Sequence, residues 1–153
     1  MGMGMVVDVV FTAIDPPVTD EDWRTAIRTR AQIAREVLGR HRWALGLLDS
    51  RHHPGHATLK RHNAFLGILR GAGFGVAMAV HGISLIDSYV NGYVLHEANL
   101  PGDVQQAADG LLEHVAQLPH LKEVVEHVMT GYDSGDEFEY GLELVLDALE
   151  ARR

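Results

Sequence analysis

The stretch from Val76 to Ala98 constrains the fold more than any other part of this chain. Apolar side chains recur so closely along it that, at 100° per residue, they cover most of the circumference of an α-helix. We expect such a helix to be buried on nearly all sides. A single polar stripe interrupts the apolar surface, made of Ser84, Asp87, Ser88 and Asn91. A buried helix with one polar stripe either lines a cavity or crosses an interface.

Helical patterns also dominate the rest of the sequence, so the predicted fold class is all-α, a helical bundle without strands. Three segments open on capping motifs, in which an Asp, Ser or Thr is followed three residues later by an acidic residue or Gln. These pairs are Thr19 with Asp22, Asp103 with Gln106, and Ser134 with Glu137. The predicted helical segments are 19–38, Ala57–Arg70, Val76–Ala98, 103–119, Leu121–Met129 and Ser134–Arg152, and Trp43–Leu48 is expected to be a compact turn or a short helix.

Charge is distributed unevenly along the 153 residues, whose formal net charge is -8. Residues 24–70 contain ten bases and two acids, whereas residues 101–153 contain twelve acids and three bases. A net acidic chain repels phosphate backbones, which argues against nucleic-acid binding by this chain alone. The sequence has no cysteine, which fits a cytoplasmic protein, and no apolar run long enough for a membrane span.

The histidines do not have the spacing of a metal site. His52, His53 and His56 surround a Pro-Gly pair that breaks any helix between them. His81 and His96 are fifteen residues apart, about 22 Å along one helix, and cannot share a metal within one chain. We expect His81 to be a hydrogen-bonded core residue. Nucleophile-elbow, zinc-protease and phosphate-loop motifs are all absent, so no catalytic residue, metal or cofactor is expected, and a metal-dependent helical enzyme is the least favoured alternative.

Asp87 is the most informative single residue, because an ionised carboxylate on an apolar helix costs several kcal/mol unless it is paired or hydrogen-bonded. His62, Arg30 or a symmetry-related chain could supply the partner. Asp87 could instead contact a ligand, and the residue pattern leaves both roles open.

Several short segments resemble, in this order, the C-terminal regulatory domain of TetR-family transcriptional repressors, of the tetracycline-repressor type. The segments are 22–24 (Asp-Trp-Arg), 72–74 (Ala-Gly-Phe), 87–89 (Asp-Ser-Tyr) with Gly92, 97–101 (Glu-Ala-Asn-Leu-Pro) and 138–144 (Phe-Glu-Tyr-Gly-Leu-Glu-Leu). The resemblance spans residues 19–150 and implies an all-helical domain that binds a small molecule. It also implies a homodimer built on a four-helix bundle, formed by the helices over 76–98 and 134–152 of each subunit.

The resemblance further implies two sets of site residues. The expected ligand-binding residues are Arg30, Ala34, His62, Phe65, Val80, Ile83, Ser84 and Asp87. The expected dimer-interface residues are Tyr89, Tyr93, Phe138, Gly141, Leu142, Val145, Ala148 and Leu149. The positions that hold drug-bound magnesium in the tetracycline repressor read here as Leu48-Asp49 and His96. The expected ligand is therefore another, more apolar small molecule.

The domain organisation expected from the resemblance has two parts. Residues 1–18 would be the remnant of a linker helix following an absent helix-turn-helix domain, and residues 19–153 the ligand-binding and dimerisation domain. DNA would be bound only through that absent domain, and no membrane is involved. The expected function is small-molecule sensing within a transcriptional repressor. The alternative is a truncated module that dimerises without responding to a ligand.

Overall fold

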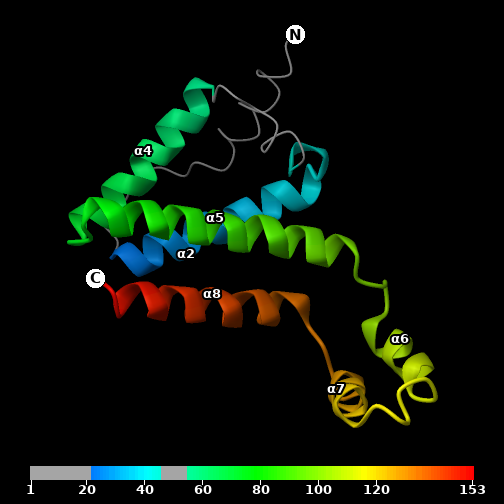
Figure 1. The fold of residues 1–153 in the computed structure, drawn as a ribbon. Helices are drawn as coiled ribbons and strands as arrows, with labels where there is room; N and C mark the ends of the chain where they lie inside the picture. The colour runs from blue at the N-terminus through cyan, green and yellow to red at the C-terminus, as the bar shows by residue number, and fades with distance from the viewer. Residues whose placement is uncertain (1–21, 46–54) are drawn as a thin grey trace.

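The computed structural model describes residues 22–45 and 55–153, which form helices joined by short turns (Figure 1). The helices are α2 (Trp23–Arg40), α4 (His56–Gly71), α5 (Val76–Ala98), α6 (Val104–Leu111), α7 (Pro119–Met129) and α8 (Ser134–Glu150). No strand occurs among the described residues, and the all-α prediction is confirmed. The predicted segment Trp43–Leu48 is helical over 43–45, and its remainder lies outside the described residues.

Aspartates cap three of these helices. Asp22 accepts a hydrogen bond from the Thr25 backbone N–H at 3.0 Å, and Asp103 accepts one from the Gln106 N–H at 2.9 Å. At α8 the predicted cap is one residue late. Asp133, rather than Ser134, is the N-cap and accepts from the backbone N–H three residues further on. Thr19 lies outside the described residues.

The main core lies among α2, α4, α5 and α8, which we call the body. α5 is its central helix and packs against the other three. The turn between α4 and α5 is part of this core, because Phe74 is fully buried there and its ring meets Trp23 of α2 edge-on at 5.0 Å. The largest fully buried side chains are Phe65, Phe74, Phe138, Ile27, Leu69, Ile86, Leu142 and Leu146.

Ion pairs join the basic helix α2 to carboxylates on α8 and at the end of α5. Arg24 and Arg28 both reach Glu143 of α8, at 2.8 and 2.6 Å. Arg35 forms a two-pronged pair with Glu97 at the end of α5, at 2.7 and 2.8 Å. Part of the charge asymmetry of the sequence is therefore neutralised inside one chain.

Helices α6 and α7, with the turns between them, form an arm over residues 103–129. Figure 1 shows the arm beyond the C-terminal end of α5 and the start of α8, on the side away from α4. Its small core of Ala108, Val115 and Val125 is separate from the main core. The predicted helix over 103–119 is wrong in extent, since α6 ends at Leu111 and turns follow before α7 begins.

One side of α5 is exposed in the single chain, which corrects the expectation of burial on nearly all sides. Leu85 and Leu95 are about half exposed on this side. His81 is also exposed and is not the core residue expected from the sequence. α8 likewise leaves Tyr140, Leu144 and Ala148 exposed, at i, i+4 and i+8. We call these two exposed sides the outer faces of α5 and α8.

Candidate ligand-binding site and dimerisation face

A charged cluster lies between α4 and α5. Arg61 of α4 donates to both carboxylate oxygens of Asp87 on α5, at 2.8 and 3.3 Å. The Arg61 side chain is only 8% exposed and that of Asp87 26% exposed. His62 Nε2 lies 3.8 Å from the same carboxylate. Asp87 thus has the buried cationic partner that its position requires.

The identity of that partner differs from the expectation. His62 was one of the candidates and does lie beside Asp87, but the main ion pair is with Arg61. The helical period explains the position of Arg61, because the buried residues of α4 are Thr58, Arg61, Phe65 and Leu69. Arg61 therefore shares the inward side of α4 with two core residues. The helical spacing of Arg61 from Phe65 and Leu69 was the feature of the sequence that could have identified it as a buried residue.

Burial lowers the pKa of His62 below its ordinary value, and the nearby Arg61 guanidinium acts in the same direction. The Asp87 carboxylate opposes the shift, but its effect is the smallest of the three. Its surroundings therefore favour the neutral form of His62 over the charged form. A neutral imidazole offers one hydrogen-bond donor and one acceptor, which suits recognition of an uncharged polar group.

Thr58 lies one turn before Arg61 and His62 on α4. Its hydroxyl is buried and has no hydrogen-bond partner within residues 22–45 and 55–153. Buried hydroxyl groups are nearly always hydrogen-bonded in folded proteins, so an unpaired one calls for an explanation. Here it adds a third kind of polar group, after the ion pair and the neutral imidazole, to the inward side of α4.

Most of the predicted ligand-binding residues lie within or at the edge of the body interior. Arg30, Ala34 and Phe65 are buried, and His62, Ile83 and Asp87 are half-buried. These six belong to α2, α4 and α5, which pack against one another. Val80 and Ser84 are exposed on α5 instead and do not point into this interior.

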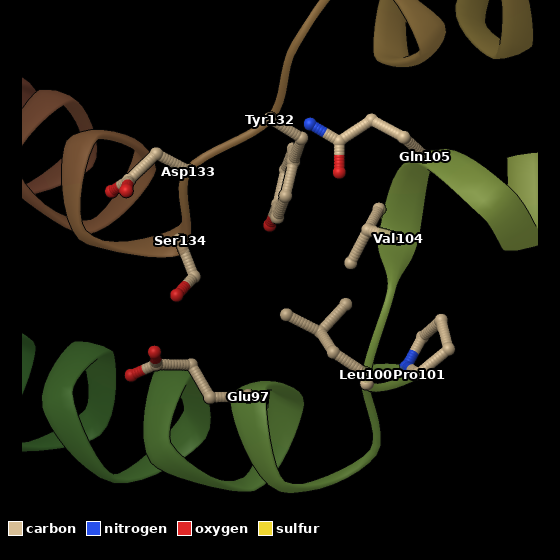
Figure 2. A pocket seen from close by; sticks show the side chains of 9 residues that line it. Glu97, Leu100, Pro101, Val104, Gln105, Tyr132, Asp133 and Ser134 are labelled. Carbon is tan, nitrogen blue, oxygen red and sulfur yellow. The ribbon is translucent and has the colours of Figure 1, made fainter.

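A separate pocket of about 330 Å³ lies at the other end of α5 (Figure 2). Its walls come from the end of α5, from the connection to the arm with the first residues of α6, and from the connection between the arm and the start of α8. They consist of Glu97, Leu100, Pro101, Gly102, Val104, Gln105, Tyr132, Asp133 and Ser134. This pocket was not predicted, because its residues come from two segments about thirty positions apart and share no motif.

The polar groups of this pocket are largely engaged with the protein itself. The hydrogen bonds from Arg35 hold the pKa of Glu97 below its usual range. Asp133 caps α8 through its contact with the backbone N–H of Asp136. The Tyr93 hydroxyl, just outside the pocket, donates to the Ser134 carbonyl at 2.6 Å. The bond from Tyr93 fastens α5 to the start of α8.

Most of the predicted dimer-interface residues lie inside the single chain. Phe138, Leu142 and Leu149 are buried in the core, and Val145 packs against it. The Tyr89 ring stacks on Phe138 at 5.5 Å, and its hydroxyl donates to the Phe138 carbonyl. Of the predicted set, Ala148 alone is exposed; it lies on the outer face of α8 with Tyr140 and Leu144, which were not in that set.

Tyr93 and Gly141 of the predicted set also have roles within the chain. Tyr93 bonds to the start of α8, as described above. Gly141 gives room to Tyr89, because a Cβ at this position would overlap the Tyr89 hydroxyl and lie 2.8 Å from its Cζ. A glycine here allows α5 and α8 to approach closely.

Two further features of the described residues bear on the kind of site. Across 22–45 and 55–153, His, Asp and Glu side chains do not gather in groups of three or more that could hold a metal ion. Within the same residues, none of the helices combines the length and apolar character needed to cross a membrane.

Comparison with known proteins identifies the family. The model of the tetracyclin repressor-like C-terminal domain matches residues 16–153, so this chain belongs to that family of TetR-type regulators. No match was found among curated proteins.

Solved structures of TetR family proteins have the same fold as this chain. One is a possible TetR family transcriptional regulator from Streptomyces coelicolor A3(2), with 29% identity and a TM-score of 0.75, covering 98% of this chain and 75% of that chain. Another is the Streptomyces coelicolor TetR family protein ActR in complex with actinorhodin, with 22% identity and a TM-score of 0.79, covering 97% and 74%. ActR has also been solved in complex with (S)-DNPA, with a TM-score of 0.78, 22% identity and coverage of 97% and 73%. The likeness to ActR concerns the fold alone.

Proposed function

We propose that this chain is the small-molecule-sensing and dimerisation domain of a TetR-family transcriptional repressor. The observation that carries the proposal is the polar cluster of Thr58, Arg61, His62 and Asp87 at the body interior. Apolar residues of similar size would stabilise a helical interior at least as well as a buried ion pair. A few polar groups within mostly apolar walls are typical of a small-molecule site.

The apolar surroundings of the cluster support a ligand that is mainly apolar with one or two polar groups. Phe65 and Ile83 belong to or pack against the same core. The complexes of ActR with actinorhodin and (S)-DNPA concern that protein. They support the proposal because ActR, which has the same fold, binds a small organic molecule.

The outer faces of α5 and α8 support dimerisation. They expose large apolar side chains, with Tyr140 at 67% and Leu144 at 55% exposure. Apolar patches of this kind mark interaction sites on proteins. In the proposed repressor, which acts in the cytoplasm, two copies pair through these faces. The ligand then selects one arrangement of the helices, and a separate helix-turn-helix domain responds to it.

A thermal-shift experiment tests ligand sensing. Actinorhodin, (S)-DNPA, tetracycline and a panel of neutral aromatic molecules are added to the purified chain. A compound that binds the native state at a hundred times its Kd stabilises it by about 2.7 kcal/mol, a rise in Tm of several degrees. We expect at least one compound to do so.

The matched variants for this experiment are Asp87→Asn and Asp109→Asn, the second an exposed carboxylate on α6. The ligand-induced rise in Tm should be lost in Asp87→Asn and kept in Asp109→Asn. If no compound raises the Tm of the wild-type chain, sensing is contradicted and the dimerisation-only module takes its place. An equal ligand-induced rise in Tm in both variants would mean that the ligand does not bind at Asp87.

A further inference from the structure

The hydroxyl of Thr58 stands apart from the other buried polar groups of this chain. Across residues 22–45 and 55–153, it is the only buried side-chain nitrogen or oxygen without a hydrogen-bond partner, and Thr58 is only 9% exposed. Threonines nearer the surface are paired, since Thr25 donates to Asp22 at 2.8 Å and Thr130 to the His127 carbonyl at 2.6 Å. A buried hydroxyl that has lost its bonds to water and gained none in return lowers the stability of the fold.

Thr58 lies beside the charged cluster between α4 and α5. It shares the buried side of α4 with Arg61 and Phe65, and this helix packs against both α5 and α2. Arg61 follows one turn later, about 4.5 Å further along the helix axis. His62 is four positions from Thr58, so the two side chains are neighbours on the helix surface. A small molecule that touches the cluster can therefore also reach the Thr58 hydroxyl.

The first turn of α4 favours a hydrogen-bond acceptor as the partner of this hydroxyl. Thr58 is the third residue of the helix, whose N-cap, Gly55, has no side chain and whose first turn has no acidic residue. The positive end of the helix dipole attracts an atom with partial negative charge. Arg61 is already paired with both oxygens of Asp87 and does not call for a second anion. A neutral oxygen acceptor suits both conditions.

We propose that Thr58 selects ligands with a neutral carbonyl oxygen, to which its hydroxyl donates a hydrogen bond. This inference rests on the small-molecule sensing proposed above and names the chemical class of the ligand, an apolar molecule with a ketone or amide carbonyl. The ligand supplies the partner that the chain itself lacks. Removal of the hydroxyl therefore has opposite effects on the free chain, which it stabilises, and on ligand binding, which it weakens.

The effect on the free chain needs no ligand. Thr58→Val replaces the hydroxyl by a methyl group of the same shape, and we expect its Tm to rise by about 3 °C. The matched control is Thr25→Val, which removes a hydroxyl that is bonded to Asp22 and should not raise the Tm. A lower Tm for Thr58→Val than for the wild type would mean that the hydroxyl is paired within the free chain, and would overturn the proposal.

Three probes test the effect on binding. 1-Indanone, indane and 1-aminoindane share one bicyclic skeleton and differ at a single position, which is a carbonyl, a methylene or an ammonium group. Titration calorimetry measures the Kd of each for the purified chain. The wild type should bind 1-indanone about fivefold more tightly than indane, the effect of one hydrogen bond, and 1-aminoindane most weakly. Thr58→Val should bind 1-indanone and indane equally, and Thr58→Ser, which keeps the hydroxyl, should keep the preference.

The outcomes separate this inference from the proposed function. A preference for 1-indanone that is lost in Thr58→Val and kept in Thr58→Ser supports the role of Thr58. Equal binding of 1-indanone and indane by the wild type, an unchanged preference in Thr58→Val, or no binding of any of the three probes overturns that role. Small-molecule sensing still stands in these cases if a compound of the thermal-shift panel raises the Tm of the wild-type chain. If no compound does so, both proposals fail.

Discussion

At the scale of single residues, Asp87 determines how the charged cluster between α4 and α5 behaves. Asp87→Asn leaves the shape of the side chain intact and removes the charge that faces the nearly buried Arg61. Asn keeps a hydrogen-bond acceptor but loses the attraction between the two charges, and we expect the free energy of unfolding to fall by about 2 kcal/mol.

Urea denaturation followed by circular dichroism measures this loss. Asp109→Asn, which removes an exposed carboxylate from α6, serves as the control and should change the free energy by less than about 0.5 kcal/mol. Equal stability of Asp87→Asn and the wild type would mean that the ion pair contributes nothing.

His62 gives the fold a dependence on pH. Its pKa is lowered in the folded chain, so the unfolded chain binds a proton more readily. Stability from this residue is therefore fully present above the ordinary histidine value of 6.5 and is lost as the pH falls below it. The variant His62→Gln should show a smaller loss of stability between pH 7 and pH 5 than the wild type.

Denaturant midpoints at a series of pH values check this difference. His120→Gln, an exposed histidine on α7, should retain the wild-type pH dependence. If the denaturant midpoint of His62→Gln changed with pH as much as that of the wild type, groups other than His62 would cause the pH dependence.

At the scale of helices, the packing of α5 on α8 depends on Gly141. In Gly141→Ala the new Cβ would overlap the Tyr89 hydroxyl, whose ring is held by stacking on Phe138 and by a hydrogen bond to its carbonyl. Overpacking of this kind costs roughly 1–3 kcal/mol, against a gain of about 1 kcal/mol in helix propensity. We expect a net loss of stability.

Thermal denaturation of Gly141→Ala measures the result against Gly39→Ala, a position in α2 where an added Cβ would meet no atom of the described residues within 4 Å. Gly39→Ala should be as stable as the wild type or slightly more stable. Stabilisation by both substitutions would rule out the tight contact at Gly141.

The helices were predictable from the sequence where a long apolar pattern ended at a glycine or a proline-rich turn. The bounds of α5, Val76–Ala98, agree with the prediction, and α4 extends it by one residue at each end. The prediction made the helix over 103–119 too long, because the apolar residues keep a helical period beyond Leu111, where the chain forms turns. In these turns Val115 packs with Val125 of α7, a contact that periodicity does not reveal.

The inner and outer sides of α8 could not be separated by periodicity. Phe138 and Leu142 face the core, while Tyr140 and Leu144 are exposed, so apolar residues lie on both sides. Which side faces α5 depends on partners far away in sequence. For the same reason Arg61 was missed as the partner of Asp87, since 26 residues separate the two.

At the scale of the whole molecule, some of the unevenly distributed charge is paired within the chain and some is not. The ion pairs of α2 with Glu143 and Glu97 neutralise some of it within the chain. The acidic arm and the exposed basic residues Lys60 and Arg70 of α4 remain apart, at opposite ends of α5. The proposed dimer about the outer faces of α5 and α8 would cover the apolar side chains that are exposed there.

Sedimentation equilibrium at micromolar concentration tests this dimer most directly, with the wild type beside Leu144→Glu, which places a charge on the outer face of α8. The wild type should have the mass of two chains. Leu144→Glu should be folded, because Leu144 is exposed, and should have the mass of one chain. A wild-type chain with the mass of a single chain, or a Leu144→Glu variant that dimerises as tightly as the wild type, would contradict the account.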